Sequence, residues 1–333
     1  MPLATSQSDA SLSVRPGEKY AAIALDAASR LQGPVNLGNG VFALPNANVV
    51  LPEHWTEWLG SIRADAIRTA PVLLLAKAAS DAVGVLDHEN VALQRRLDAL
   101  YWCLLASGPL RVEGGVRFTG ARGPGGIDVR QVSETRSVVS LQGLLHPPLT
   151  EPHLRRAAVM SLSLSELLAA PGMRRIKMAV RTFMLAFEEE NIGERIHQFV
   201  RCIDGIVCAR GREQFKERSK LFVGEQASSV CSELYLMRNN AEHFSDPAKG
   251  LDPLPLREDL VRAFRRAHEA EALARYCMCR LVETRAWSHL TDDDRVDEFW
   301  RISVEQRAAA WGPPLDLAAA VAQFNPAYVP DET

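Results

Sequence analysis

The sequence lacks several features that would assign it to a class at once. No apolar run approaches the roughly 20 residues that a membrane-spanning helix needs. Residues 1–13 are polar and contain no apolar segment of the kind found in signal peptides. The net charge is only −3, so contact with nucleic acid would need a local group of basic residues rather than a basic surface. We therefore expect a cytoplasmic protein that has no membrane partner.

Motifs for metals and nucleotides are also missing. No two cysteines form a C-x2-C pair, and no histidines form an H-x3-H pair, so we expect no metal and no cofactor. The glycine-rich segment 120–126 lacks the Lys-Ser/Thr of a phosphate-binding loop and is interpreted as the tip of a hairpin. The cysteines lie in apolar, helix-like segments and are interpreted as buried free thiols of a reducing compartment. They are Cys103, Cys202, Cys208, Cys231, Cys277 and Cys279.

The chain is long enough for two domains. Its 333 residues, with 47% hydrophobic and 24% charged residues, are typical of globular proteins that bury a core in each domain. A Pro147-Pro148 break separates a mixed half from a helical half. We expect an α+β domain over residues 15–150, an all-α bundle over 151–311 and a loosely packed tail over 312–333. The fold should be mainly α.

Apolar periodicity locates the elements of each half. In the first half we expect helices at 17–31, 54–68 and 91–105, short strands within 35–51, a β-hairpin at 110–118 around a Gly-Gly pair, and a further strand at 138–145. In the second half, apolar residues recur at helical spacing in four segments. These segments cover residues 176–187, 196–207, 227–241 and 270–281, and they predict a four-helix bundle.

One helical segment carries residues suited to phosphate chemistry. Arg238 and Asn239 are followed by His243 in an R-x4-H spacing. Histidine is the side chain that can exchange a proton near neutral pH, and the planar guanidinium group of arginine can stabilise charge on a phosphate. Together they could cleave RNA without a metal ion.

The pattern Y-x-x-R-N-x-x-x-H, formed by Tyr235, Arg238, Asn239 and His243 in the third helix of a bundle, resembles the HEPN superfamily of ribonucleases and interaction modules. The stretch 195–206 is similar to an earlier helix of that superfamily, with Asp204 at its acidic position. The resemblance covers roughly residues 174–287 and is nearest to bacterial anti-phage and toxin proteins. It implies that Arg238 and His243 are the catalytic pair, with Asn239 as an accompanying polar residue, and that the protein is a homodimer.

Helical geometry gives these residues distinct roles. At about 100° per residue, Arg238 lies within the apolar stripe, while Asn239 and His243 project together on the other side, with His243 about 140° from Arg238. A charged Arg238 on the bundle face needs a partner, for which Asp204 is the candidate. Asn239 is placed to orient the ring of His243, and Tyr235 lies one turn before Asn239. We therefore expect an endoribonuclease in which His243 is the general acid and base and Arg238 stabilises the phosphorane.

The same residues also fit a structural interpretation. Arg238 and Glu242 are spaced for an ordinary intrahelical ion pair, and His243 is a favourable residue at a helix C-terminus. The competing hypothesis is a non-catalytic HEPN-like protein that mediates dimerisation or docking within a larger assembly. In either case residues 15–150 could receive a regulatory partner or ligand.

A basic segment precedes the motif helix and could contact RNA phosphates, although such charge runs also occur on solvated helix faces. Its seven basic residues are Arg195, Arg201, Arg210, Arg212, Lys216, Arg218 and Lys220.

Overall fold

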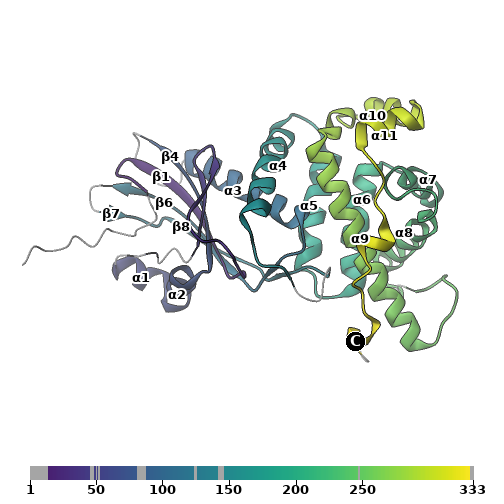
Figure 1. The fold of residues 1–333 in the computed structure, drawn as a ribbon, viewed down its shortest axis with the longest axis horizontal. Helices are drawn as coiled ribbons and strands as arrows, with labels where there is room; N and C mark the ends of the chain where they lie inside the picture. The colour runs from purple at the N-terminus through teal and green to yellow at the C-terminus, as the bar shows by residue number, and fades with distance from the viewer. Residues whose placement is uncertain are drawn as a thin grey trace, which may run out of the picture. The chain divides into compact units, whose positions relative to one another are not determined.

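The computed structural model describes residues 14–45, 49, 51, 53–80, 88–123, 126–141, 146–246 and 248–330. It is a mixed α/β protein, with strands in the purple-to-teal part of the chain and helices only in the green-to-yellow part (Figure 1). The chain forms two compact units. The sheet unit comprises Met1–Tyr101, Leu110–Val138 and Pro147–Ala158, and the helical unit comprises Trp102–Pro109, Val139–His146 and Val159–Thr333. In the described ranges no helix combines the length and apolarity needed to cross a membrane.

The sheet unit is built on an antiparallel sheet of seven strands in the order β2-β3-β4-β1-β6-β7, with β8 paired to β6. The strands are β1 (Glu18–Leu25), β2 (Val35–Gly38), β3 (Val41–Pro45), β4 (Val72–Ala79), β6 (Gly115–Gly123), β7 (Gly126–Ile127) and β8 (Gln131–Thr135). The short strands expected within residues 35–51 are thus confirmed in β2 and β3. Of the segment predicted as a hairpin tip, residues 120–123 belong to β6 and Gly123 pairs with Gly126, while residues 124 and 125 lie outside the described residues.

The helix expected at residues 17–31 is wrong, because residues 18–25 of that segment form β1. The strand lies between β4 and β6 and is buried on both faces from Lys19 to Leu25. A central strand needs apolar residues on both faces, so its sequence shows no alternation. The alanines within it gave an apolar spacing that also fits a helix, and strand pairing overrides that weak local preference.

Three helices belong to this half: α1 (Glu53–Leu59), α2 (Ser61–Thr69) and α3 (His88–Ser107). They confirm the helices expected at 54–68 and 91–105. Leu59 of α1 and Ile67 of α2 join a core with Tyr20 and Phe118, whose rings meet edge to face at 5.9 Å between centroids. Helices α1 and α2 therefore bury one face of the sheet.

The hairpin expected at residues 110–118 does not form. Its first part is β5 (Arg111–Val112), which pairs with β9 (Val138–Val139), whereas its second part begins β6 and pairs with β1. A side chain at Gly115 would collide with the carbonyl oxygen of Ala24, so the glycine permits close strand approach rather than a turn. The strand expected at 138–145 ends at Val139, and residues 142–145 lie outside the described residues.

The four predicted amphipathic segments are all helical, as α5 (Arg174–Glu188), α6 (Ile192–Val207), α8 (Ser228–Glu242) and α9 (Leu256–Glu283). Helix α6 packs against each of the other three. The crossing of α5 and α6 is close, because a Cβ atom on Gly205 would lie 2.7 Å from the Cβ of Ala179. The remaining elements are α4 (Glu151–Ala169), α7 (Arg212–Val223), η1 (Ala286–His289), α10 (Asp293–Arg301), α11 (Val304–Trp311), α12 (Leu317–Ala320) and η2 (Pro326–Tyr328).

The tail from residue 312 is packed more closely than expected. Leu317 and Val329 are buried. The guanidinium group of Arg257 on α9 donates to the carbonyl oxygens of Val329 and Pro330. Composition does not show which backbone carbonyls accept hydrogen bonds from a side chain, so the proline content of this segment alone could not predict its packing.

A buried ionic network fixes the segments before α4 to the helical unit. Glu271 of α9 is fully buried and accepts hydrogen bonds from the Oγ of Ser140, the backbone N–H of Leu141 and, at 2.9 Å, the Nε of Arg275. Burial alone would raise the pKa of Glu271. The charges of Arg275 and Arg195 and the hydrogen bonds from Ser140 and Leu141 bring that pKa below its ordinary value of 4.5. The carboxylate is therefore ionised inside the protein and serves the fold.

Candidate functional site

Arg238 lies near the end of α8 and its side chain is mostly buried, with 17% exposed. Its Nη1 donates to the Oδ1 of Asn239 at 2.7 Å and lies 3.2 Å from a carboxylate oxygen of Glu242. The guanidinium group also lies over the ring of Tyr235, 5.5 Å from its centroid. The intrahelical ion pair of the structural interpretation is thus present, and the guanidinium group is held in one orientation by three neighbours.

Arg238 also lines a pocket between α5, α6 and α8 with a volume of about 230 Å³. The charged residues of this pocket, hereafter the arginine pocket, are Arg175 of α5, Arg201 and Asp204 of α6, and Arg238 itself. Three guanidinium groups and one carboxylate line the pocket, and two further carboxylates, those of Glu242 and Asp293, lie near Arg238 and Arg175. Guanidinium groups bind phosphate oxygens through paired N–H donors, so this pocket is suited to an anion of phosphate size.

Asp204 lies in the arginine pocket but makes no ion pair with Arg238 within the described residues. Its Oδ1 is buried and has no hydrogen-bond partner in that part of the chain. Burial raises the pKa of Asp204, and the charge of Arg238 acts against that rise. The predicted relation between the two residues is therefore electrostatic and not a direct contact.

His243 is the residue that caps α8 at its C-terminus, and it is exposed. It does not line the arginine pocket. Asn239, which we expected to orient the ring of His243, instead accepts from Arg238, and among the described residues no side-chain partner of His243 is found. The ring lies beyond the last helical residue, where i, i+4 geometry no longer fixes it. Helix α8 therefore carries an arginine whose side chain is fixed by its neighbours, and it ends at a histidine whose side chain has no partner among the described residues.

His197 of α6 lies near the arginine pocket and is not among the site residues expected from the sequence. It is 9% exposed and stands one turn before Arg201 and two turns before Asp204 on α6. Within the described ranges neither ring nitrogen has a hydrogen-bond partner, and Nδ1 lies 3.5 Å from Glu194. Burial lowers the pKa of His197, and Arg201 and Arg238 lower it further. The i, i+4, i+7 spacing of a histidine, an arginine and an aspartate was the available signal.

The basic segment divides between the interior and the surface. Arg195 is buried and donates to the carbonyl oxygens of Ala186 and Val139, so it belongs to the interior and cannot contact RNA in this structure. Arg218 donates to the carbonyl oxygens at the end of α6 and lies 4.8 Å from the ring centroid of Trp300. Both arginines therefore hold helices in place.

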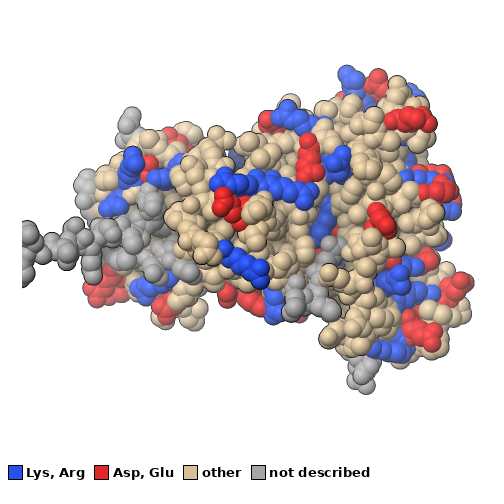
Figure 2. All heavy atoms as spheres, viewed as in Figure 1, with Lys and Arg blue, Asp and Glu red and all other residues tan. Residues whose placement is uncertain are grey.

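The other basic residues are surface or half-exposed groups. Lys220 pairs with Glu217 and Glu225, and Arg212 donates to the Oγ of Ser232. Lys216 is half-buried, and Arg210 is exposed with Asp297 at 3.7 Å. On the face shown in Figure 2 positive and negative side chains are interspersed. Of the seven, only Arg201 lines the arginine pocket.

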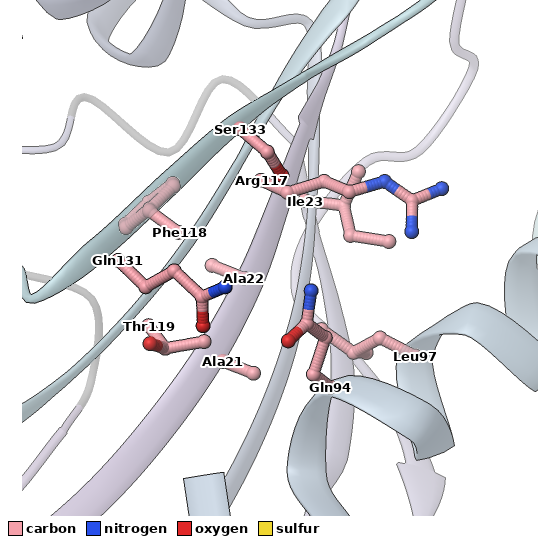
Figure 3. Close-up of a pocket in the computed structure, with 10 residues that line it drawn as sticks. All are labelled: Ala21, Ala22, Ile23, Gln94, Leu97, Arg117, Phe118, Thr119, Gln131 and Ser133. Carbon is pink, nitrogen blue, oxygen red and sulfur yellow. The ribbon is translucent and has the colours of Figure 1, made fainter. Parts of the chain in front are cut away.

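A small pocket lies in the sheet unit, between α3 and the strands β1, β6 and β8. Figure 3 shows Gln94 of α3 extending toward the strand side chains, with Thr119 and Gln131 nearby. The Oγ1 of Thr119 is buried without a hydrogen-bond partner among the described residues. The volume, about 10 Å³, has room for one water molecule at most. This pocket therefore suits a structural water and not a ligand.

The cysteines are buried free thiols, as predicted. Burial raises the pKa of Cys231 to about 12, and it also raises the pKa of Cys202 and Cys277. Thiols that stay protonated at neutral pH are poor nucleophiles and poor metal ligands. These cysteines therefore contribute packing to the helical unit.

Comparison of the chain with protein families, with curated proteins and with solved structures found no match in any of the three. The functional argument for this protein accordingly depends on its own residues. At the arginine pocket and the neighbouring end of α8, charged side chains from three helices lie close together.

Proposed function

We propose that the protein is a metal-independent endoribonuclease of HEPN type, with its active site at the arginine pocket and the C-terminal end of α8. The observation that carries the proposal is the position of Arg238. It lines a pocket with two other arginines, and it precedes an exposed histidine by five residues on the same helix. Phosphate binding and proton transfer are thereby available from one small region.

In the proposed reaction the 2′-oxygen of a ribose attacks the adjacent phosphorus. His243 removes the proton of the 2′-hydroxyl, the new O–P bond forms, and the bond from phosphorus to the 5′-oxygen breaks. The leaving oxygen takes a proton from a protonated histidine, so the products are a 2′,3′-cyclic phosphate and a free 5′-hydroxyl. Arg238 stabilises the negative charge of the phosphorane, with Arg175 and Arg201 binding the flanking oxygens.

The spacing of the pair favours a homodimeric site. Arg238 and His243 are separated by about 7.5 Å along the axis of α8 and by about 140° around it. Within one chain, Arg238 and His243 are therefore poorly placed to contact the same phosphate. A two-fold axis that brings the ends of two α8 helices together would place two arginines and two histidines around one cleft.

The proposed role is a cytoplasmic effector of phage defence or a toxin, regulated by a partner or ligand that binds residues 15–150. The competing role is a non-catalytic HEPN-like module that mediates dimerisation or assembly. The ion pair between Arg238 and Glu242 favours that second role, because it gives the arginine a structural partner.

Expression in a bacterial host separates the two roles. We expect wild-type protein to arrest growth and His243→Ala protein, at equal abundance, to be harmless. His243 is exposed and makes no side-chain contact recorded in the described ranges, so the variant should fold normally. A harmless wild-type protein would favour the assembly module. Equal toxicity of the two proteins would exclude His243 from the harmful activity.

A further inference from the structure

A second, larger pocket adjoins the arginine pocket. Its volume is about 510 Å³, within the range of sites that bind small molecules. It lies between the start of α5 and the segment that joins η1 to α10. Its lining includes Met173, Arg175, Met178, Leu290, Asp293 and Val296.

The two pockets share Arg175 and Met178 in their linings, so they are adjacent. A phosphate bound by Arg175, Arg201 and Arg238 would have the larger pocket directly beside it. A nucleotide has this layout, with an anionic group at one end and a flat, largely apolar base at the other.

The larger pocket offers an apolar floor and an acidic rim. Met173, Leu290 and Val296 are buried beneath it, and Met178 is 42% exposed. These side chains can cover the face of an aromatic base. The rim carries carboxylates that can accept hydrogen bonds from the base edge.

Of the two carboxylates at the rim, Asp292 and Asp293, only that of Asp293 is available to accept hydrogen bonds from a ligand. Asp292 caps α10, and its carboxylate accepts from the backbone N–H of Arg295 and from the hydroxyl of Thr291, both at 2.9 Å. Asp293 has 89% of its side chain exposed, and its recorded ion pair is a loose one, 3.6 Å from Arg175. An exposed pair of that length is weak and easily exchanged.

We propose that this pocket binds a guanine base next to the phosphate held in the arginine pocket. Guanine presents two adjacent N–H donors, on N1 and on the 2-amino group, which match the two oxygens of the Asp293 carboxylate. Adenine, cytosine and uracil lack that pair of donors. The inference rests on the proposed function, in which the ligand is RNA, and it adds a preference for guanosine beside the scissile phosphate.

The test is binding of guanosine, inosine and uridine 3′-monophosphates to the full chain, measured by calorimetry. Inosine differs from guanosine by the 2-amino group alone. We expect guanosine 3′-monophosphate to bind about fivefold tighter than the inosine compound, the size of one net hydrogen bond. Asp293→Asn should abolish this ratio. Asp294→Asn, the same charge change at an exposed neighbour that does not line the pocket, should preserve it.

The outcomes distinguish this inference from the proposed function. Guanosine preference that depends on Asp293 supports the pocket, even in a protein that cuts no RNA. Equal binding of guanosine and inosine compounds, or a preference unchanged in Asp293→Asn, overturns it, even in an active ribonuclease. Absence of binding by all three nucleotides overturns it as well.

Discussion

Replacing Glu271 by glutamine should strongly destabilise the helical unit. The carboxylate is fully buried and accepts from Ser140, Leu141 and Arg275, and its charge also faces Arg195. Glutamine keeps the shape but leaves two buried arginines without their counter-charge. Loss of one member of a buried ion pair costs about 3–5 kcal/mol. For a unit of this size that corresponds to a fall in Tm of roughly 6–20 °C.

Thermal unfolding followed by circular dichroism measures this effect, with Glu258→Gln as the matched control. Glu258 is exposed on the first turn of the same helix, so its loss should cost less than about 1 kcal/mol. Because the pKa of Glu271 is lowered from 4.5, its stabilisation is complete above pH 4.5 and is lost as the pH falls further. The gap between wild type and Glu271→Gln should narrow below pH 4.5. Equal Tm values at pH 7 would refute the account of the network.

The remaining predictions concern the site. Arg238→Ala should lower Tm by about 2–4 °C, as expected for roughly 1 kcal/mol, whereas His243→Ala should leave Tm unchanged. Equal Tm values for the two variants would refute the partly buried, hydrogen-bonded position of Arg238. Asp204→Asn should tighten binding of inorganic phosphate and raise Tm at pH 7. Burial raises the pKa of the Asp204 carboxyl, so its ionisation destabilises the fold. The gain in Tm of the variant should therefore vanish below pH 3.8, where the carboxyl is protonated in both the folded and the unfolded state. Gly205→Ala should destabilise by about 1–3 kcal/mol through the contact with Ala179, and an unchanged Tm would count against it. Mixed Arg238→Ala and His243→Ala chains should recover part of any RNA cleavage, and activity should fall on dilution; full activity in a strict monomer would exclude the composite site.

The helices of the second half could be predicted because their buried faces repeat at helical spacing. The apolar faces of α5 and α6 include Phe183, Phe187 and Phe199, whose rings contact one another in the core. Strands in the first half were harder to predict. The run that forms β1 is buried on both faces, and Arg111 and Gly115 belong to different sheets although four residues apart. Pairing between distant segments decides such cases.

The site was only partly predictable for a similar reason. The i, i+4 spacing of Arg238 and Glu242 predicted their ion pair, because that pair depends on the geometry of one helix alone. The arginine pocket depends on how α5, α6 and α8 cross, and the close crossing of α5 and α6 depends on Gly205 at the contact with Ala179. No pattern within one segment could bring Arg175 to the same pocket. Likewise, helical periodicity predicts that Asn239 lies beside His243, whereas in the structure the side chain of Asn239 accepts a hydrogen bond from Arg238.

The most direct test of the account is cleavage of RNA by the purified protein in the presence of EDTA. We predict cutting that leaves 2′,3′-cyclic phosphate ends and that falls by about 100-fold or more in both Arg238→Ala and His243→Ala. Loss of cutting in EDTA with rescue by Mg²⁺ would contradict a metal-independent mechanism. Wild-type rates in the two variants would contradict the assignment of the site.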